Sequence, residues 1–492
     1  MKIIIFIPFL IAAICNSSFA QPSYLDPSFG NDGIVITHYS IGALSIGDFS
    51  SVVMQPDQKI VAAGTDAEQM IVIRYLENGT LDSTFGVNGI FSSGYYHTLL
   101  NEIILQPDEK IVGLGGILGP GDILLIRLNT DGSLDNTFGT GGIDTIGLGA
   151  YVLALQPDGK IIVAGGNATT IGVARFLPDG APDSSFGVNG LSWPCYGEVH
   201  GIAIMPDGRI VVGGLTDTGS FIALRLLSNG ALDTSFNHTG ITTTLVGDSY
   251  DYSHALQLQP DGKIVLGGSG TFGATGSDFV LVRYNTDGSL DGSYGNGGIT
   301  HVDFNENYDE IWAMYQQPDG KMVAAGYAII TANENFALCR VNTDGSIDSA
   351  FGNNGRITTQ IQSNNDRALS VTEQLDGKVI LGGYATDSTG YRGQMTLARY
   401  LTPTVNVNNV IRINNALILY PNPSTGKLNI KGSVSHITSI SACDVRGNQI
   451  SINTSLPTHE IYTDGIADGL YFFKISFDDR PPIVQKIIIQ KN

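Results

Sequence analysis

Three turn segments of the sequence place side-chain oxygens at a spacing that could bind a hard metal ion. Each reads Asn-x-Asp-Gly-x-x-Asp, in which the glycine lets the chain bend so that amide and carboxylate oxygens face one centre. Calcium prefers such oxygen ligands. Because the first ligand is an amide, a turn held by its own side-chain hydrogen bonds is the simpler interpretation. The candidate calcium ligands are Asn129, Asp131 and Asp135; Asn285, Asp287 and Asp291; and Asn342, Asp344 and Asp348.

Motifs for catalysis are missing from the sequence. The eight histidines are scattered without a His-Glu-x-x-His pair, and no Gly-x-Ser-x-Gly elbow occurs. The sequence contains no phosphate-binding loop. Its 62 glycines are explained by the many turns. We therefore expect a protein that is not an enzyme and that has no cofactor, unless calcium binds the turn segments.

These candidate positions belong to a repeated pattern. A phrase close to Gln-Pro-Asp-Gly-Lys occurs seven times, and its aspartates are 49 to 58 residues apart. Each repeat holds four short apolar runs, such as 151–156, 160–164, 171–176 and 190–193, which are typical of antiparallel strands joined by tight turns. The seven aspartates are Asp57, Asp108, Asp158, Asp207, Asp261, Asp319 and Asp376.

Seven repeats of four strands predict an all-β chain that folds as a seven-bladed β-propeller. A β-solenoid is the alternative, although its repeats are usually shorter. The first Leu-Asp-x-Ser-Phe-Gly turn, at 25–30, precedes a strand at 33–37, whereas the last repeat ends at 395–401 without a fourth strand. The N-terminal strand should therefore close the last blade and remove the exposed edges of an open array.

The phrases PDGK, Arg-Tyr in the third strand and LDxSFG recur together in a fixed order over about residues 22–402. In this respect the chain resembles the delta-60 repeat family. The resemblance implies an exported bacterial protein with a propeller-like fold, and it implies no particular activity or catalytic residue.

The end of the chain has another character. Residues 420–423 (YPNP), 426–430 (GKLNI), 444–447 (DVRG) and 465–473 (GIADGLYFF) follow one another in 412–492, where alternating strands predict a small β-sandwich. This segment resembles the type A C-terminal sorting domain of the type IX (Por) secretion system. The resemblance implies Bacteroidota-type export through the outer membrane by that machinery, followed by attachment to the cell surface or release.

Residues 1–20 have the order of a secretory signal peptide, with Lys2, an apolar run at 3–15 and small residues before a cleavage site after Ala20. No later apolar stretch has the length of a transmembrane helix. The formal net charge of −20 argues against nucleic acid as a partner. We thus expect a secreted or cell-surface monomer; its expected segments are signal peptide 1–20, propeller 21–402, linker 403–411 and sorting domain 412–492.

Two sets of charged residues recur with the repeats. The third strand of every repeat carries one arginine, as in Arg127 and Arg283. We expect these arginines to form bidentate pairs with turn acids such as Asp135 or Asp291; an anion-binding ring is the alternative. The hairpin lysines, such as Lys110, are expected to be surface charges.

In each repeat, one residue stands seven positions before the repeated aspartate; His200 and His254 are two of these residues. This position starts the first strand of each repeat, which should lie nearest the propeller axis, so it could line the mouth of a channel. The histidines would then be polar rim residues or, alternatively, a metal pair. Convergence of His254 with Asp309 and Glu310 would indicate an enzyme.

Loops that enter the first strands and leave the second strands should share one face, and they are rich in aromatic and acidic residues. Aromatic rings with nearby carboxylates suit sugar rings, although they could also simply cover the blade ends. We expect a non-enzymatic module that binds an extracellular glycan or protein; a structural surface repeat protein and a polysaccharide-acting enzyme are the alternatives. The candidate ligand-binding residues are Tyr96, Trp193, Asp251, Tyr252, Tyr308, Asp309 and Trp312.

Overall fold

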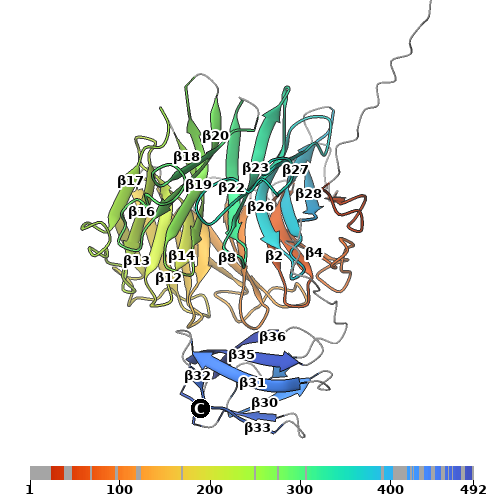
Figure 1. Ribbon diagram of the computed structural model, residues 1–492, viewed down its shortest axis with the longest axis vertical. Coiled ribbons are helices and arrows are strands. Elements are labelled where there is room, and N and C mark those ends of the chain that lie inside the picture. Colours follow the sequence, from red (N-terminus) through yellow and green to blue (C-terminus); the bar gives the residue numbers. More distant parts are fainter. Residues whose placement is uncertain are drawn as a thin grey trace, which may run out of the picture. The chain divides into compact units, whose positions relative to one another are not determined.

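Short strands joined by tight turns make up the computed structural model, and the residues that it describes contain no helix (Figure 1). None of these residues forms a helix with the length and apolarity that a membrane span requires. The chain divides into two units, residues 1–404 and 405–492. The described residues are 24–37, 47–66, 69–94, 98–117, 123–167, 170–248, 251–273, 276–304, 307–388 and 393–402, and then 418–420, 424, 426–431, 437–444, 449–455, 460–463, 465–467, 469–477 and 483–489. The signal peptide, the linker and Tyr96 lie outside them.

The described part of the first unit contains repeated four-stranded antiparallel sheets. In the order of their hydrogen bonding, the sheets are β2 (Asp48–Met54), β3 (Ile60–Asp66), β4 (Gln69–Tyr75) and β5 (Ile90–Ser92); β6 (Thr98–Leu105), β7 (Ile111–Ile117), β8 (Ile123–Leu128) and β9 (Ile143–Ile146); β10 (Ala150–Leu155), β11 (Ile161–Asn167), β12 (Thr170–Phe176) and β13 (Leu191–Tyr196); β14 (Glu198–Ile204), β15 (Ile210–Leu215), β16 (Phe221–Leu226) and β17 (Ile241–Thr244); β18 (Tyr252–Leu258), β19 (Ile264–Thr271), β20 (Ser277–Tyr284) and β21 (Ile299–Val302); β22 (Asp309–Gln316), β23 (Met322–Ile330), β24 (Asn333–Val341) and β25 (Arg356–Thr359); and β26 (Asp366–Glu373), β27 (Val379–Thr386), β28 (Gly393–Tyr400) and β1 (Ile34–Thr37).

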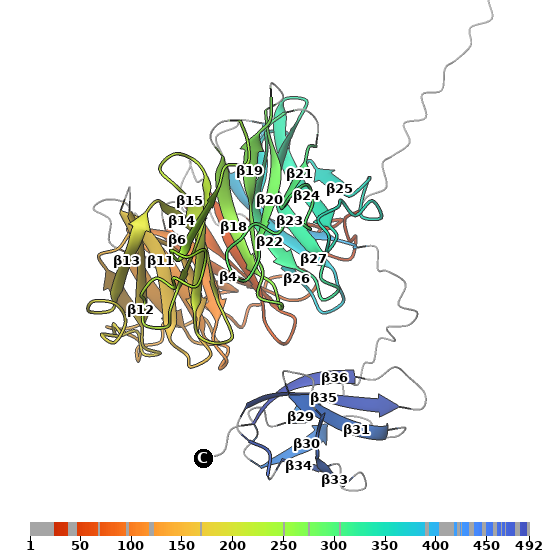
Figure 2. The ribbon, with the colours of Figure 1, turned by 60° about the vertical axis from the view of Figure 1, so that its left-hand side comes forward.

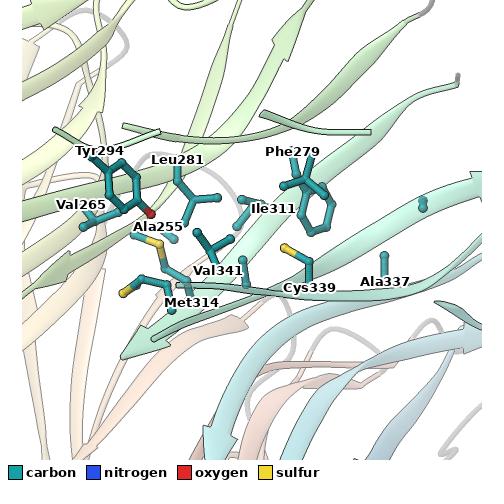
Figure 3. Close-up of a cluster of buried hydrophobic side chains, with 14 residues drawn as sticks. Ala255, Val265, Phe279, Leu281, Tyr294, Ile311, Met314, Ala337, Cys339 and Val341 are labelled. Carbon is teal, nitrogen blue, oxygen red and sulfur yellow. The ribbon is translucent and has the colours of Figure 1, made fainter. Parts of the chain in front are cut away.

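Successive sheets pack side by side. The first strands β18, β22 and β26 are neighbours in both views (Figures 1 and 2). Each pair of adjacent sheets encloses an apolar cluster. Figure 3 shows the cluster in which Phe279 and Leu281 of one sheet lie against Ile311 and Met314 of the next. Repeated four-stranded sheets packed in this way fit a β-propeller, so the predicted all-β fold class is correct.

Turn chemistry explains why the strands form where they do. In the third repeat, Gln156 N donates to Lys160 O at 2.8 Å and Gly159 N donates to Gln156 O at 2.9 Å. Gly159 has a φ of +84°, which is accessible to glycine without a steric penalty. The equivalent residues Gln58 and Glu109 adopt φ values of +69° and +64° without that freedom.

The first and last sheets are joined directly. Strand β1 pairs antiparallel with β28, with Ile34 opposite Ala398. Between the two sheets, Val52 N donates to Ser370 Oγ at 2.9 Å. The N-terminal strand therefore occupies the fourth position of a sheet whose other three strands end the repeat region.

Buried ion pairs recur at the turn modules, as the sequence predicted. Arg127 Nε donates to Asp135 Oδ2 at 2.7 Å, and its guanidinium lies 4.7 Å from the centre of the Phe138 ring. Its Nη1 donates to Pro178 O of the next repeat at 2.6 Å, and the arginines at 74, 175, 225, 283 and 399 make the equivalent contact, so these six also tie neighbouring repeats together. The pairs are Arg74–Asp82, Arg127–Asp135, Arg175–Asp183, Arg225–Asp233, Arg283–Asp291, Arg340–Asp348 and Arg399–Asp26.

The hairpin lysines are partly exposed, as expected of surface charges, and they also have a buried partner that the sequence analysis did not predict. Lys110 Nζ lies 2.8 Å from Asp135 Oδ2, the same oxygen that Arg127 contacts. Burial would raise the pKa of Asp135, but hydrogen bonds from Lys110 and Thr137 and the charge of Arg127 outweigh it and hold this pKa well below its usual range. Asp135 therefore stays ionised and interacts with both Lys110 and Arg127.

The second unit contains two four-stranded sheets. They are β29 (Ile418–Tyr420), β30 (Lys427–Lys431), β34 (Glu460–Tyr462) and β33 (Asn453–Ser455); and β32 (Gln449–Ile450), β31 (Ile437–Asp444), β35 (Gly469–Phe477) and β36 (Ile483–Ile489). Both sheets contribute to one buried cluster, in which Leu428 and Ile461 of the first meet Phe473 and Ile475 of the second. A core shared by two sheets is the arrangement of a β-sandwich.

Candidate functional site

A cavity of about 630 Å³ is lined by residues of the first strand of every sheet in the first unit. The residues seven before the repeated aspartates all contribute to it, which confirms that this position faces a common space. The first strands are therefore the innermost ones. These lining residues are Ser50, Asn101, Tyr151, His200, His254, Trp312 and Leu369.

A β-bulge places each of these residues. In β18 the pairing with β19 shifts register between Ser253 and Ala255, so that His254 is the extra residue. In β22 the shift lies between Ile311 and Ala313, around Trp312. The same shift occurs at the corresponding position of the other five first strands. Bulges re-aim a side chain and are common beside functional sites, so the backbone itself directs one residue per repeat at the cavity.

Aromatic and histidine rings gather on one side of the cavity. The rings of His254 and Trp312 are stacked, with centroids 4.4 Å apart and an interplanar angle of 8°. Tyr252 lies parallel to His254 with centroids 6.3 Å apart, and His200 meets His254 edge-on at 5.4 Å. The sequence predicted the positions of these residues in their repeats, but it did not predict this stack.

One carboxylate is hydrogen-bonded to the stack. His254 Nε2 and Glu310 Oε1 are 2.6 Å apart. Burial would raise the pKa of Glu310, but the hydrogen bond and charge of His254 and a hydrogen bond from Tyr327 outweigh it and lower this pKa. Glu310 is therefore an anion that holds the His254 ring in place.

Other polar groups in the cavity are buried. Burial, with a further contribution from the charge of His254, lowers the pKa of His200 to about 4, so His200 is neutral at pH 7. Burial raises the pKa of Glu102 to about 7 even though its carboxylate accepts a hydrogen bond from Leu153 N at 2.7 Å. Trp312 Nε1 is buried without a hydrogen-bond partner in the described residues. The cavity thus combines the stacked rings of Trp312 and His254 with a neutral imidazole.

The structure separates the candidate ligand-binding residues of the sequence. Tyr252 and Trp312 meet at His254, whereas Trp193 is 46% exposed on β13, the outermost strand of its sheet. Tyr308 is exposed next to β22. Among the described candidates, only Tyr252 and Trp312 are brought together, because both rings lie beside His254 of β18.

Asp251 and Asp309 are buried rather than presented on a loop surface. Asp251 accepts hydrogen bonds from Val246 N at 2.9 Å and Gly247 N at 3.0 Å, and Asp309 accepts one from Phe304 N at 2.8 Å. Both side chains cap the loop that precedes a first strand. The convergence of His254 with Glu310 is present, but Asp309 does not join it, because consecutive residues of a strand face opposite sides.

The candidate calcium turns use their oxygens in internal contacts. Asp131 Oδ1 accepts hydrogen bonds from Ser133 N at 2.9 Å and Ser133 Oγ at 2.6 Å, and Asn129 Nδ2 donates to Ser133 Oγ at 3.0 Å. Asp135 is paired with Arg127 and Lys110. Calcium binding at these turns stays a prediction; the contacts are those of an Asx turn.

Two protein families match the chain. The DUF5122 β-propeller family, whose domain is described as being of unknown function, matches residues 55–85, 106–138, 156–186, 206–236, 259–294 and 317–351. The secretion system C-terminal sorting domain family matches residues 418–490. Both resemblances inferred from the sequence motifs are therefore confirmed. No curated protein matches the chain.

Solved structures show similarity of fold at low identity. Virginiamycin B lyase from Staphylococcus aureus is 12% identical, with a TM-score of 0.44 over 74% of this chain and 98% of that one. The polysaccharide lyase Uly1 is 8% identical, with a TM-score of 0.42 over 75% and 92%. The extracellular domain of a putative one-component system from B. thetaiotaomicron is 12% identical, with a TM-score of 0.40 over 92% and 57%. The repeats of the chain thus match the DUF5122 β-propeller family in six segments, and its last part matches the secretion system C-terminal sorting domain family.

Proposed function

We propose that the protein is a seven-bladed, closed propeller at residues 21–402, preceded by a signal peptide at 1–20 and followed by a linker at 403–411 and the sorting domain at 412–492. Three contacts support closure: β1 on β28, Val52 N on Ser370 Oγ, and Arg399 Nη1, which donates to Glu77 O at 2.5 Å. The sorting domain indicates export by the type IX system to the cell surface or the extracellular space.

We further propose that the central cavity binds a sugar residue of an extracellular glycan and catalyses no reaction on it. The observation that carries this proposal is the parallel arrangement of Trp312, His254 and Tyr252 in two neighbouring innermost strands. Flat rings stack on the apolar face of a sugar, and nearby donors bind its hydroxyl groups. A cavity of about 630 Å³ has the size that small-molecule sites usually have.

A glycan-array screen of the secreted chain, residues 21–492, tests the proposal. Calorimetry then measures the affinity for the soluble oligosaccharides that bind. The expected result is binding that Trp312→Ala weakens at least tenfold. Trp193→Ala is the matched control, because Trp193 is the other tryptophan of the chain and lies on an outer strand. Equal losses in both variants, or no binding of any glycan, would rule out the cavity as a sugar site.

Catalysis on a polysaccharide is a second candidate function, favoured by the 2.6 Å contact of His254 Nε2 with Glu310 Oε1 near the neutral His200. An imidazole oriented by a carboxylate can accept and return a proton. Release of new chain ends from polysaccharides that bind would support this function, provided that Glu310→Gln abolishes release and leaves binding within a few-fold. A binding protein without activity would release none.

A further inference from the structure

Three carboxylates converge away from the cavity, where two adjacent sheets of the first unit meet. Asp278 lies in β20, Asp303 directly follows β21 of the same sheet, and Asp309 begins β22 of the next sheet. Each contributes one oxygen, and these three oxygens lie within 4.8 Å of one another. Among the described residues, this is the group of three acidic side chains that is placed to share one ion.

Two of the carboxylates are buried with an oxygen left over. Asp278 is 1% exposed and Asp309 is fully buried. Asp278 Oδ1 and Asp309 Oδ1 have no hydrogen-bond partner in the described residues. The second oxygen of Asp309 accepts the hydrogen bond from Phe304 N, and that of Asp278 contacts His301 Nε2. A buried carboxylate oxygen without a partner is costly, and these two oxygens are available to an ion.

The neighbouring pair of sheets shows the same architecture without the charge. Asn335 of β24 lies opposite Ala328, in the register at which Asp278 of β20 lies opposite Gly270. Asp366, the counterpart of Asp309, caps its own loop by accepting hydrogen bonds through Oδ2 from Ile361 N at 2.7 Å and Gln362 N at 3.1 Å. Like Asp309 Oδ1, its Oδ1 has no hydrogen-bond partner in the described residues, so an unpartnered Oδ1 goes with loop capping. Loop capping thus needs only the last of the three positions, and the acids at 278 and 303 require another explanation.

We propose that Asp278, Asp303 and Asp309 bind one divalent cation, with calcium as the best fit, and that the ion links the two sheets. Calcium–oxygen distances are about 2.3–2.6 Å, so oxygens on opposite sides of one ion are at most about 5 Å apart. The 4.8 Å limit found here meets that condition. This site is separate from the turn segments and does not depend on glycan binding.

Calorimetry tests the proposal. The secreted chain, residues 21–492, is first treated with a chelator and is then titrated with calcium chloride. We expect one ion per chain, and at least tenfold weaker binding in Asp278→Asn and in Asp303→Asn. Asp303 is partly exposed, so its variant keeps the test usable if Asp278→Asn does not fold. Asp366→Asn is the matched control in the neighbouring sheet pair and Asp131→Asn is the control in a turn segment; both should bind as the parent does.

Two results would overturn the proposal. One is a parent protein that takes up no calcium. The other is calcium uptake that persists in both Asp278→Asn and Asp303→Asn. If calcium uptake were instead lost in Asp131→Asn, the ion would be assigned to the turn segments. A melting temperature that calcium raises in the parent and in Asp366→Asn, but not in Asp303→Asn, would show in addition that the ion links the sheets.

Discussion

Trp312 and His254 stack with ring centroids 4.4 Å apart although they belong to different sheets and are separated by a whole repeat. Each is the extra residue of a β-bulge in an innermost strand. The bulge therefore explains the contact: it aims one side chain per repeat at the cavity, and neighbouring repeats bring two such side chains into van der Waals contact.

Tryptophan fluorescence should report on the cavity. The chain contains two tryptophans, so Trp193→Phe leaves Trp312 as the single emitter. We expect its emission to change when a binding oligosaccharide is added, because the sugar would cover a ring whose N–H has no protein partner. The reverse variant, Trp312→Phe, reports from β13 and should show no change; a change there would place the ligand elsewhere.

Stability should depend strongly on the arginines and weakly on the lysines of the turn modules. Arg283→Ala leaves Asp291 buried without its main partner, and we expect unfolding in urea to require about 3–5 kcal/mol less. Lys263→Ala removes a partly exposed cation from the same carboxylate and should cost about 0–1 kcal/mol. Similar losses in the two variants would contradict the assignment of the arginine as the essential partner.

Backbone strain in one hairpin can be relieved. Glu109 has a φ of +64° at a position where Gly159 and other repeats carry glycine. Glu109→Gly should raise the free energy of unfolding by about 0.5–1 kcal/mol. Gln58→Gly should gain less, because Gln58 Oε1 accepts a hydrogen bond from Leu375 N at 3.1 Å. Denaturant curves of the two variants give the comparison, and a loss in Glu109→Gly would exclude strain there.

The pH dependence of stability should include a contribution from Glu102. Burial raises its pKa from 4.5 to about 7 in the folded chain, so the folded chain binds more protons than the unfolded chain between these values. Stability contributed by this group is therefore greatest at low pH and falls as the pH rises from about 4.5 to about 7. Glu102→Gln removes the titration and can still accept the hydrogen bond from Leu153 N.

Relative to the parent, Glu102→Gln should consequently become more stable as the pH is raised from 5 to 7.5, by about 1–3 kcal/mol. Parallel denaturant curves across this range measure the difference. A difference that stays constant with pH would show that Glu102 is not desolvated.

Closure of the repeat region makes a further prediction. A chain that begins at residue 47 lacks β1, leaves β28 as an open edge, and removes Asp26 from Arg399. We expect it to melt at a lower temperature and to associate through the exposed edge. Asp26→Asn separates the effects, since it loses the ion pair and keeps the strand. A truncated chain that stays monomeric and equally stable would show that closure contributes nothing.

Much of the fold follows from local sequence. In the third repeat the predicted runs 151–156 and 171–176 fall on β10 (Ala150–Leu155) and β12 (Thr170–Phe176). Glycine with positive φ, a capping aspartate and β-branched runs act within a few residues, so they can be read without knowing distant contacts. The arginine–aspartate pairs could be predicted for a similar reason, because both partners recur in every repeat.

The candidate sites could be predicted only in part. The register that lines the cavity was predicted because it repeats, whereas the hydrogen bond of His254 to Glu310 joins residues that occur once. Asp251 and Asp309 were predicted to contact a ligand, since acidic residues in loops are usually exposed; their burial follows from loop capping, which depends on where the backbone N–H groups lie.

The all-β repeat, the turn chemistry, the register that faces the cavity and the sorting domain could all be inferred from residues near one another or from recurrence. Which side chains meet could not be inferred in this way: Trp312 with His254, and Asp278 with Asp303 and Asp309. These contacts cross between sheets. Their geometry depends on how neighbouring sheets pack and where each strand bulges, and no short segment of the chain contains that information.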